Sequence, residues 1–200
     1  MSNFILLLPV LIGYLLGSMP FGFWIVKAVK QVDLRQIGSG GTGMTNVKRA
    51  AGWPWAILTF ILDCGKGTLS VYLGLLTSTY LHNTSHVLPL ICGLAAVFGH
   101  SKSCLLGFKG GKSVATGIGT FLMLAPIETL IGFVTGVILI KLFRMVSVGS
   151  IIGTITIVTC TYLFHEPVPY LVFFTIVGVY VIWLHRANMQ RILNGTENKI

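Results

Sequence analysis

Residues 99–116 read GHSKSCLLGFKGGKSVAT, and this stretch joins two long apolar runs of the chain. Its paired glycines, Gly110 and Gly111, let the backbone approach a ligand closely, and they are flanked by Lys109 and Lys112. An apolar helix is predicted to follow, so free amide groups and the positive end of a helix dipole face one point. The stretch predicts a phosphate-binding loop, and the alternative is a basic turn that contacts lipid headgroups.

A nucleotide-binding P-loop does not fit this stretch. The Walker A pattern Gly-x-x-x-x-Gly-Lys-Ser/Thr requires glycine at position 106, where the chain has Leu106. A strand should also precede such a loop, and the preceding residues show no β-strand pattern. Nucleotide binding through a P-loop is therefore excluded.

The composition predicts that the loop belongs to a membrane protein. Hydrophobic residues make up 54% of the 200 residues and charged residues only 10%. The mean hydropathy is +0.86. The apolar runs are continuous and lack the alternation of barrel strands, so helices are expected. We predict an all-α integral membrane protein with a single domain over residues 1–200.

The cysteines give no sign of a metal or a disulfide framework. Cys64, Cys92, Cys104 and Cys160 lie singly in or beside apolar segments and show no CxxC spacing. We therefore expect no metal site and no other cofactor.

Seven transmembrane segments are predicted, five long and two short. They cover residues 4–26, 53–79, 87–106, 114–125, 127–140, 148–164 and 168–184, and residues 80–86 form an outer loop. Pro126 is expected to break the run from 114 to 140, which gives the two short segments. A five-span alternative keeps that run as one helix.

The distribution of basic residues favours seven segments over five. With a turn at Pro126, Lys141 and Arg144 join the other basic loops on the cytoplasmic side. Only Lys66 among the 14 basic residues then lies away from that side. The N-terminus is expected outside, and the C-terminus is cytoplasmic in either arrangement.

Asp63 and Lys66 lie within the second segment, three residues apart and therefore on one helical face. Charges inside a membrane segment are costly unless they are paired or face a polar cavity. We expect these two to form a structural ion pair that steadies the helix bundle.

Polar residues gather in four patches that the topology places on the cytoplasmic face, at residues 38–49, 100–113, 141–150 and 185–197. Most of these patches combine Lys or Arg with Ser, Thr or Gly at helix ends, which suits the binding of phosphate esters. The net charge of +9 agrees with anionic substrates and equally with anionic lipid headgroups.

Four motifs in the same order resemble those of a known family. The first reads Gly-Ser-Gly-x-x-Gly-x-Thr-Asn-Val-x-Arg, and the second joins Gly-His to Phe-Lys-Gly-Gly-Lys-x-Val-Ala-Thr. The third reads Arg-x-Val-Ser-x-x-Ser, and the fourth reads His-Arg-x-Asn-x-x-Arg-x-x-x-Gly-x-Glu. Together with Asp63-x-x-Lys66-Gly67, they resemble the bacterial acyl-phosphate-dependent glycerol-3-phosphate acyltransferases, the PlsY family, nearly end to end. Gly41 and Ser113 depart from the usual Asn and Gly of that family.

The resemblance implies an enzyme of phospholipid biosynthesis. It would transfer a fatty acyl group from acyl-phosphate to the 1-hydroxyl of glycerol 3-phosphate, giving lysophosphatidic acid and phosphate. No covalent acyl-enzyme is implied, and the substrate's own phosphate assists deprotonation. The site would face the cytoplasm from the bacterial inner membrane. The lipid bilayer and the two substrates are the expected partners, with functional coupling to the enzyme that makes acyl-phosphate and no binding of nucleic acid.

The resemblance also implies roles for individual residues. Catalysis is assigned to Ser39, Arg49, Lys109, Lys112, His185 and Asn188. Substrate or phosphate binding is assigned to Gly38, Gly40, Thr45, Asn46, His100, Gly110, Gly111 and Ser147. Structural roles are assigned to Asp63, Lys66 and Glu197. For His100 the sequence leaves open a second interpretation, a satisfied histidine at the membrane interface.

A small transporter or permease for phosphate esters is the alternative function. Such proteins are built from internal repeats, with broken helices aimed at a site in the middle of the membrane. The sequence shows no such repeat, and its polar motifs gather at one face. The enzyme interpretation is therefore preferred.

Overall fold

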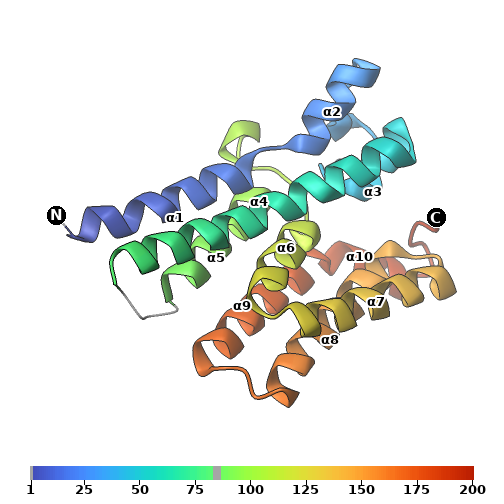
Figure 1. Cartoon of the computed structure of the whole chain (residues 1–200). Helices are drawn as coiled ribbons and strands as arrows, with labels where there is room; N and C mark the ends of the chain where they lie inside the picture. The colour runs from blue at the N-terminus through green and yellow to red at the C-terminus, as the bar shows by residue number, and fades with distance from the viewer. Residues whose placement is uncertain (1, 83–86) are drawn as a thin grey trace. The chain divides into compact units, whose positions relative to one another are not determined.

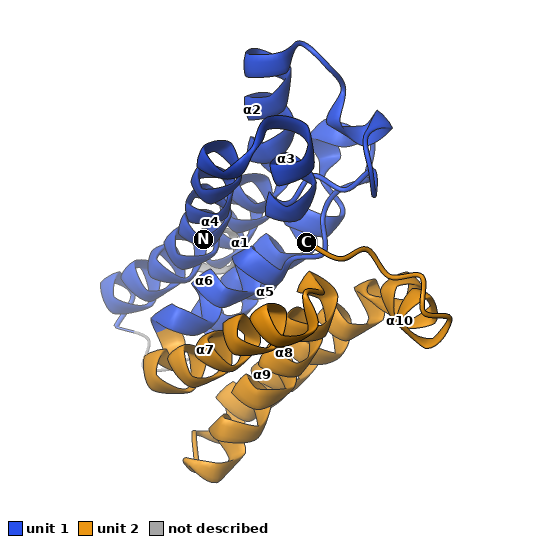
Figure 2. Cartoon of the chain, turned by 90° about the vertical axis from the view of Figure 1, so that its right-hand side faces the viewer, with its two compact units in different colours: residues 1–123 blue, residues 124–200 orange. Residues whose placement is uncertain are grey.

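The structure is a computed structural model that describes residues 2–82 and 87–200, with side chains from residue 6 onward. The end of the outer loop predicted at 80–86 lies outside the described residues. The chain divides into two compact units, residues 1–123 and 124–200, which are coloured separately in Figure 2. Each unit is described by itself below.

Unit 1 contains the N-terminal helices and both glycine-rich loops (Figure 1). Its elements are α1 (Ser2–Ser18), α2 (Phe21–Lys30), η1 (Leu34–Gln36), α3 (Met44–Ala51), α4 (Trp53–Tyr80), α5 (Val87–Ser101), η2 (Cys104–Leu106) and nearly all of α6 (Val114–Leu124). Helices α1, α4 and α5 pack against one another, and α2 and α3 pack against α4. The predicted first segment is thus two helices, because Met19 and Pro20 interrupt it.

Unit 2 is a helical unit in which consecutive helices pack together. It contains α7 (Pro126–Phe143), α8 (Val146–Leu163), α9 (Val168–Leu184) and the short α10 (Arg186–Leu193). Two glycine pairs allow α7 and α8 to approach closely: a Cβ atom at Gly136 would lie 2.9 Å from the Gly149 carbonyl, and one at Gly153 would lie 2.8 Å from the Gly132 carbonyl. Small residues at such contacts are typical of membrane helices.

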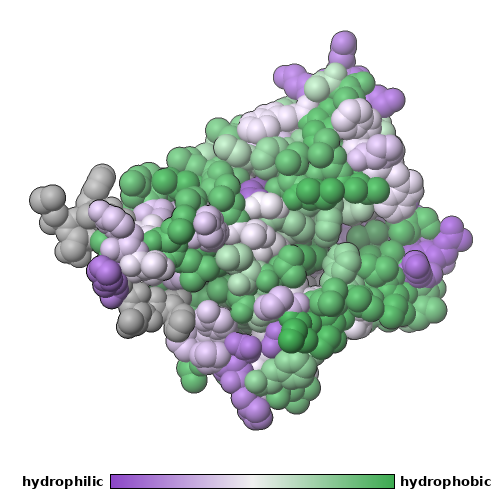
Figure 3. All heavy atoms as spheres, in the orientation of Figure 1, coloured by the Kyte–Doolittle hydropathy of each residue, from purple (hydrophilic) through white to green (hydrophobic). Residues whose placement is uncertain are grey.

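Among the described residues, five segments are long and apolar enough to cross a membrane. They are Leu6–Lys30, Trp53–Tyr80, Val87–Leu106, Pro126–Phe143 and Val146–Leu163, and α9 with α10, bent by 54°, gives a sixth if it counts as one span. Much of the surface in Figure 3 is hydrophobic. Many large apolar side chains of the protein are exposed, among them Ile61 and Leu130. Such surface suits contact with lipid tails.

The predicted break at Pro126 is confirmed, because α6 ends at Leu124 and α7 begins at Pro126. A single helix over residues 114–140 is therefore wrong. The expectation of two short segments is also wrong, since α7 has 18 residues and is about 27 Å long. It continues to Phe143, three residues beyond the end of the predicted segment at residue 140. Helix α6, with 11 residues, is the short one of the two.

Close backbone contact also joins α4 to α6 in unit 1. A Cβ atom at Gly67 would overlap the carbonyl oxygen of Thr116, and one at Gly119 would overlap the carbonyl of Cys64. The hydroxyl of Thr68 donates a hydrogen bond of 2.9 Å to the Gly119 carbonyl. Glycine at these two positions thus allows the backbones of α4 and α6 to lie closer together than any side chain would permit.

This packing makes Gly67→Ala destabilising. The added methyl would meet the Thr116 carbonyl and come within 3.1 Å of the Thr120 amide, so we expect a loss of about 1–3 kcal/mol in stability. Gly65→Ala is the matched control in the same helix, because a Cβ atom there meets nothing within 4 Å. Thermal unfolding in detergent measures both variants. Equal melting temperatures for the two would contradict this account of the α4–α6 contact.

Candidate functional site

The Gly-Ser-Gly loop, residues 37–43, is closed by the side chain of Asn46 in the first turn of α3. Its Nδ2 group donates to the carbonyls of Leu34, Ile37 and Gly41 at 3.1, 2.9 and 2.9 Å. Its Oδ1 atom accepts from the Ser39 amide at 3.3 Å. Asn46 is only 2% exposed. Its amide holds the loop in shape, and the predicted phosphate contact of Asn46 gains no support from this geometry.

Two glycines with positive φ present Ser39 at the tip of this loop. Gly38 has φ +55° and Gly40 has φ +68°, in the left-handed region that favours glycine. Ser39 is exposed between them. A Cβ atom at Gly38 would lie 3.2 Å from Cδ of Arg49, so the arginine side chain passes beside the turn. The loop therefore brings Ser39 and Arg49 to one region, while Thr45 lies in the first turn of α3.

The glycine-lysine loop, residues 107–113, is attached to α5 at two points. The Gly111 amide donates to the His100 carbonyl at 3.2 Å, and the buried Ser113 hydroxyl donates to the Val97 carbonyl at 2.7 Å. Ser113 has φ +60°, a conformation that costs serine more than glycine. The departure from the glycine usual in the family thus adds a hydrogen bond to the loop at the cost of backbone strain.

The two loops line one cavity of about 370 Å³. Its lining residues are Asp33, Arg35, Gln36, Gly40, Thr42, Lys109 and Gly110. Gly40, Lys109 and Gly110 were predicted from the sequence, and the other four were not. Among the described residues, Ser39, Arg49, Gly111 and Lys112 do not belong to this lining. The cavity nevertheless shows that the two loops lie together, although some 70 residues separate them in the sequence.

Arg35 is fixed in the cavity wall by Asp33. Its Nη2 and Nε groups donate to Asp33 Oδ2 and Oδ1 at 2.6 and 3.0 Å, and its amide donates to Oδ1 at 2.9 Å. The side-chain hydrogen bonds from Arg35 lower the pKa of Asp33 to about 2. Asp33 therefore stays ionised at neutral pH and holds the guanidinium in place. The Asp-x-Arg spacing just before the loop was the available sequence signal.

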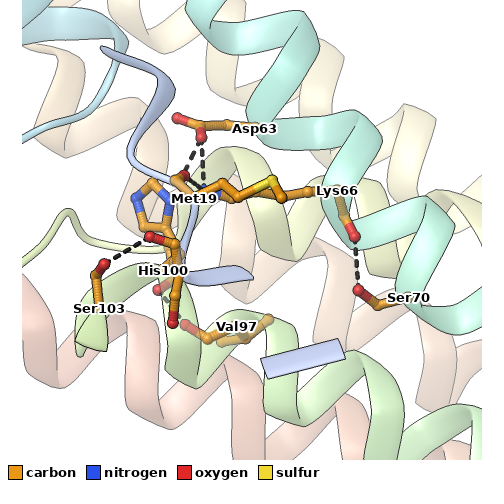
Figure 4. A network of polar contacts seen from close by, with 9 residues as sticks. Met19, Asp63, Lys66, Ser70, Val97, His100 and Ser103 are labelled. Atoms are coloured by element: carbon orange, nitrogen blue, oxygen red, sulfur yellow. Dashed lines mark hydrogen bonds and ion pairs between the residues drawn. The ribbon is translucent and has the colours of Figure 1, made fainter. Parts of the chain in front are cut away.

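Figure 4 shows a network of buried polar groups that includes Asp63, Lys66 and His100, and His100 also meets Gly110 and Gly111 of the glycine-lysine loop. Lys66 Nζ is 2.8 Å from Asp63 Oδ1, with both side chains 2% exposed, so the expected ion pair is present. Lys66 also donates to the Met19 carbonyl at 2.9 Å. His100 Nδ1 is 3.6 Å from the same Asp63 oxygen, and His100 is 6% exposed. Like Asp63, His100 is absent from the described lining of the cavity.

In unit 2, Glu197 gathers several residues of the predicted site. Its Oε1 atom accepts from Ser147 Oγ at 2.8 Å and from Asn188 Nδ2 at 2.6 Å, and its Oε2 atom accepts from Arg191 Nε at 2.8 Å. Burial opposes ionisation of Glu197, but these hydrogen bonds outweigh it and lower its pKa. The geometry fits the structural role expected for Glu197.

His185 lies at the junction of α9 and α10, three residues before Asn188. Its Nδ1 atom is 2.8 Å from the Val181 carbonyl, which fixes the orientation of the ring. His185 and Asn188 are both buried. Unit 2 therefore holds its predicted functional side chains in defined orientations through backbone and carboxylate contacts.

Both units carry groups suited to phosphorylated ligands. In unit 1, lysine and arginine side chains, backbone amides at glycines and the N-terminus of α6 offer positive charge and hydrogen-bond donors. In unit 2, hydroxyl, amide and imidazole groups are held by Glu197 and by the backbone. These groups can orient anions and stabilise developing negative charge.

A model of the family described as glycerol-3-phosphate acyltransferase matches residues 7–195. The chain is 43% identical over 194 residues to the glycerol-3-phosphate acyltransferase of Synechococcus sp. (strain JA-3-3Ab), covering 97% of this chain and 93% of that protein. It is 40% identical over 201 residues to that of Rippkaea orientalis, covering 96% of this chain and 92% of that protein.

Two solved structures of PlsY (YgiH), an integral membrane glycerol 3-phosphate acyltransferase, are similar to the whole chain. The glycerol 3-phosphate form has a TM-score of 0.90 and 36% identity, and the lysophosphatidic acid form has a TM-score of 0.87 and 34% identity. Each match covers 98% of this chain and 95% of the other. The chain therefore belongs to the glycerol-3-phosphate acyltransferase family and is an all-helical integral membrane protein of the PlsY type.

Proposed function

We propose that the protein transfers a fatty acyl group directly from acyl-phosphate to the 1-hydroxyl of glycerol 3-phosphate. Membership of the family makes it a glycerol-3-phosphate acyltransferase that produces lysophosphatidic acid. The acyl-phosphate donor, the direct transfer and the roles of individual residues are the proposal. The observation that carries it is a cavity lined by Lys109 and Gly110 from the glycine-lysine loop, by Gly40 from the Gly-Ser-Gly loop and by Arg35 just before that loop. Such a lining suits phosphate groups.

The reaction needs positioning more than a strong nucleophile. The substrate hydroxyl attacks the acyl carbonyl carbon, a new ester C–O bond forms, and the C–O bond to the phosphate breaks. The hydroxyl proton passes to a phosphate oxygen, and inorganic phosphate leaves. Because an acyl-phosphate is already activated, the protein has to hold two anions together and stabilise charge at the carbonyl.

We assign the residues of unit 1 to these two tasks, holding the anions and stabilising charge at the carbonyl. Lys109, Gly110, Gly111 and Lys112 hold the phosphate of glycerol 3-phosphate. Ser39 and Arg49, supported by Gly38 and Gly40, donate hydrogen bonds to the acyl-phosphate and to charge that develops during transfer. Asn46 keeps their loop in shape, and Thr45 contributes at the start of α3.

In unit 2, we assign substrate contacts to Ser147, His185 and Asn188, which Glu197 and the Val181 carbonyl hold in place. We treat both units as parts of one acyltransferase domain over residues 1–200. In support, the family match at residues 7–195 spans the boundary between the units. No cofactor enters this scheme, because the mixed anhydride of the acyl-phosphate supplies the chemical activation.

For the topology, we propose seven segments with the N-terminus outside and the site on the cytoplasmic face of the bacterial inner membrane. Two features support this arrangement. The break at Pro126 allows the chain to turn between α6 and α7, and Lys141 and Arg144 at the end of α7 then obey the positive-inside rule. A cytoplasmic site also faces the compartment expected to supply acyl-phosphate.

The function is tested by incubating the purified protein with acyl-phosphate and glycerol 3-phosphate and measuring phosphate release. Release that requires both substrates supports the proposal, and release from acyl-phosphate alone contradicts it. Intact-mass spectrometry after incubation with acyl-phosphate alone tests the direct transfer. We expect no acyl adduct, and a stoichiometric adduct on Ser39 would show a covalent acyl-enzyme instead.

Arg49→Lys should lower kcat/KM by about 10- to 100-fold, because a point charge replaces a guanidinium that can donate two parallel hydrogen bonds to a phosphate. The neighbouring Lys48→Arg is the matched control. Lys48 Nζ lies 4.4 Å from the centre of the Trp53 ring, a contact that arginine can also make, so we expect little change. Steady-state kinetics in detergent measures both. Near-normal kcat/KM for Arg49→Lys would remove Arg49 from the catalytic group.

The topology is tested with single cysteines in a cysteine-free background. Lys141→Cys, near the exposed end of α7, should react with a membrane-impermeant maleimide only from the cytoplasmic side. Tyr80→Cys, at the end of α4 and 80% exposed at present, should react only from the outside. Labelling of both positions from the same side would contradict the seven-segment arrangement.

A further inference from the structure

Two of the three glycines in the glycine-lysine loop, Gly110 and Gly111, pack against His100. A Cβ atom at Gly110 would overlap the His100 carbonyl oxygen, and one at Gly111 would overlap Nε2 of the His100 ring. The Gly111 amide donates to the same carbonyl at 3.2 Å. The sequence explained these glycines by close approach of a ligand. The structure adds a second cause, because their absent side chains leave room for a histidine that supports the loop.

The His100 ring is itself held from the opposite side. Its Nδ1 atom faces Asp63 Oδ1 at 3.6 Å, while its Nε2 atom faces Gly111. The distance exceeds that of a good hydrogen bond, so the carboxylate acts on the ring mainly through its charge. Both side chains are almost fully buried, and little water screens this attraction. The orientation of the ring is therefore set by Asp63.

Asp63 is fixed in turn by Lys66, and Lys66 by the interruption between α1 and α2. The ammonium group lies 2.8 Å from Asp63 Oδ1 and donates to the Met19 carbonyl at 2.9 Å (Figure 4). A continuous series of contacts thus runs from Met19 through Lys66, Asp63 and His100 to Gly111. It joins α4 and α5 to the loop, and all of its members belong to unit 1.

An ion pair with a purely structural role would not require His100 beside Asp63. A buried pair of opposite charges steadies a helix bundle no better than well-packed apolar residues in many proteins. Lys66 lies three residues from Asp63 on the same helix, so the pair by itself joins no two helices. The pair does place the Asp63 carboxylate beside His100. The ring and the carbonyl of His100 both meet the loop that carries Lys109.

We infer that Asp63 and His100 are positioning residues for the glycerol 3-phosphate loop, with His100 in contact with Gly110 and Gly111 and Asp63 acting through His100. They hold the backbone of the loop where Lys109 and the Gly110 amide can bind a phosphate. This inference rests on the proposed function, because it takes the ligand of the loop to be glycerol 3-phosphate. It replaces the direct ligand contact first expected of His100.

The test compares two double variants that both lack the ion pair. Asp63→Asn with Lys66→Met keeps an oxygen facing His100 Nδ1, whereas Asp63→Leu with Lys66→Met places an apolar side chain of similar size there. We expect the Leu variant to raise the KM for glycerol 3-phosphate by about 10-fold or more. Residues that orient a binding group without touching the ligand usually have effects of this size. The Asn variant should raise this KM less, because its amide oxygen keeps part of the negative charge that faces Nδ1. The KM for acyl-phosphate should change little in both.

Ser70→Ala separates positioning from stability. Ser70 lies on the same helix and its buried hydroxyl donates to the Lys66 carbonyl at 2.7 Å, but it has no part in the contacts to His100. It should lower the melting temperature without raising the KM for glycerol 3-phosphate. Equal KM values for the Asn and Leu double variants, or equal effects on both substrates, would overturn the inference and leave the charged groups purely structural.

Two further experiments test the positioning role of His100 independently of the double variants. If the Leu double variant does not fold, His100→Gln and His100→Leu give the same comparison with the ion pair intact, since only Gln can donate to Asp63. Isothermal titration calorimetry with glycerol 3-phosphate alone measures the affinity of the protein for this substrate without any acyl donor. A parent protein that binds glycerol 3-phosphate but releases no phosphate when acyl-phosphate is also present would contradict the proposed donor. Equal binding of glycerol 3-phosphate by the Gln and Leu variants would contradict the positioning role.

Discussion

The ion pair between Asp63 and Lys66 is the constraint on which unit 1 depends. Charged groups buried in a membrane helix are costly unless each has a partner, and here each member of the pair also has a partner in another part of the unit. Lys66 reaches the Met19 carbonyl, which the interruption before Pro20 leaves outside the regular helix. Asp63 reaches His100 on α5. The requirement to satisfy two charges therefore sets the relation between the helix interruption, α4, α5 and the loop that follows α5.

Glycine makes these relations compatible with close packing. At Gly67 and Gly119 the backbones of α4 and α6 meet without intervening side chains, so α6 begins directly beside the helix that carries the charges. At Gly111 the missing side chain leaves room for the His100 ring. The loop is thus held between α5 and the start of α6, and its lysine at position 109 projects toward the cavity that the Gly-Ser-Gly loop also lines. Substrate positioning, the main requirement of the proposed transfer, follows from this backbone arrangement.

Features carried by local sequence were predictable, and features that depend on distant contacts were not. The break at Pro126 followed from the chemistry of proline, but the length of α7 did not, because charge placement was taken as the end of the helix. The interruption at Pro20 was missed, since it lies inside a run without charges. The side chain of Asn46 was assigned to a ligand because sequence does not reveal that three carbonyls would surround it. Arg35 and Thr42 were missed for a related reason: their place in the cavity depends on a loop some 70 residues away.

The central claim is that the glycine-lysine loop binds the phosphate of glycerol 3-phosphate, and solid-state NMR tests it most directly. Protein labelled with 15N in its lysine side chains is loaded with glycerol 3-phosphate, and the dipolar coupling between 31P and 15N is measured. The account predicts a coupling that is weakened in Lys109→Gln and in Lys112→Gln, lost when both lysines are replaced, and unchanged in the control Lys30→Gln, at the end of α2. A coupling that persists after both lysines are replaced would place the phosphate elsewhere and contradict the account.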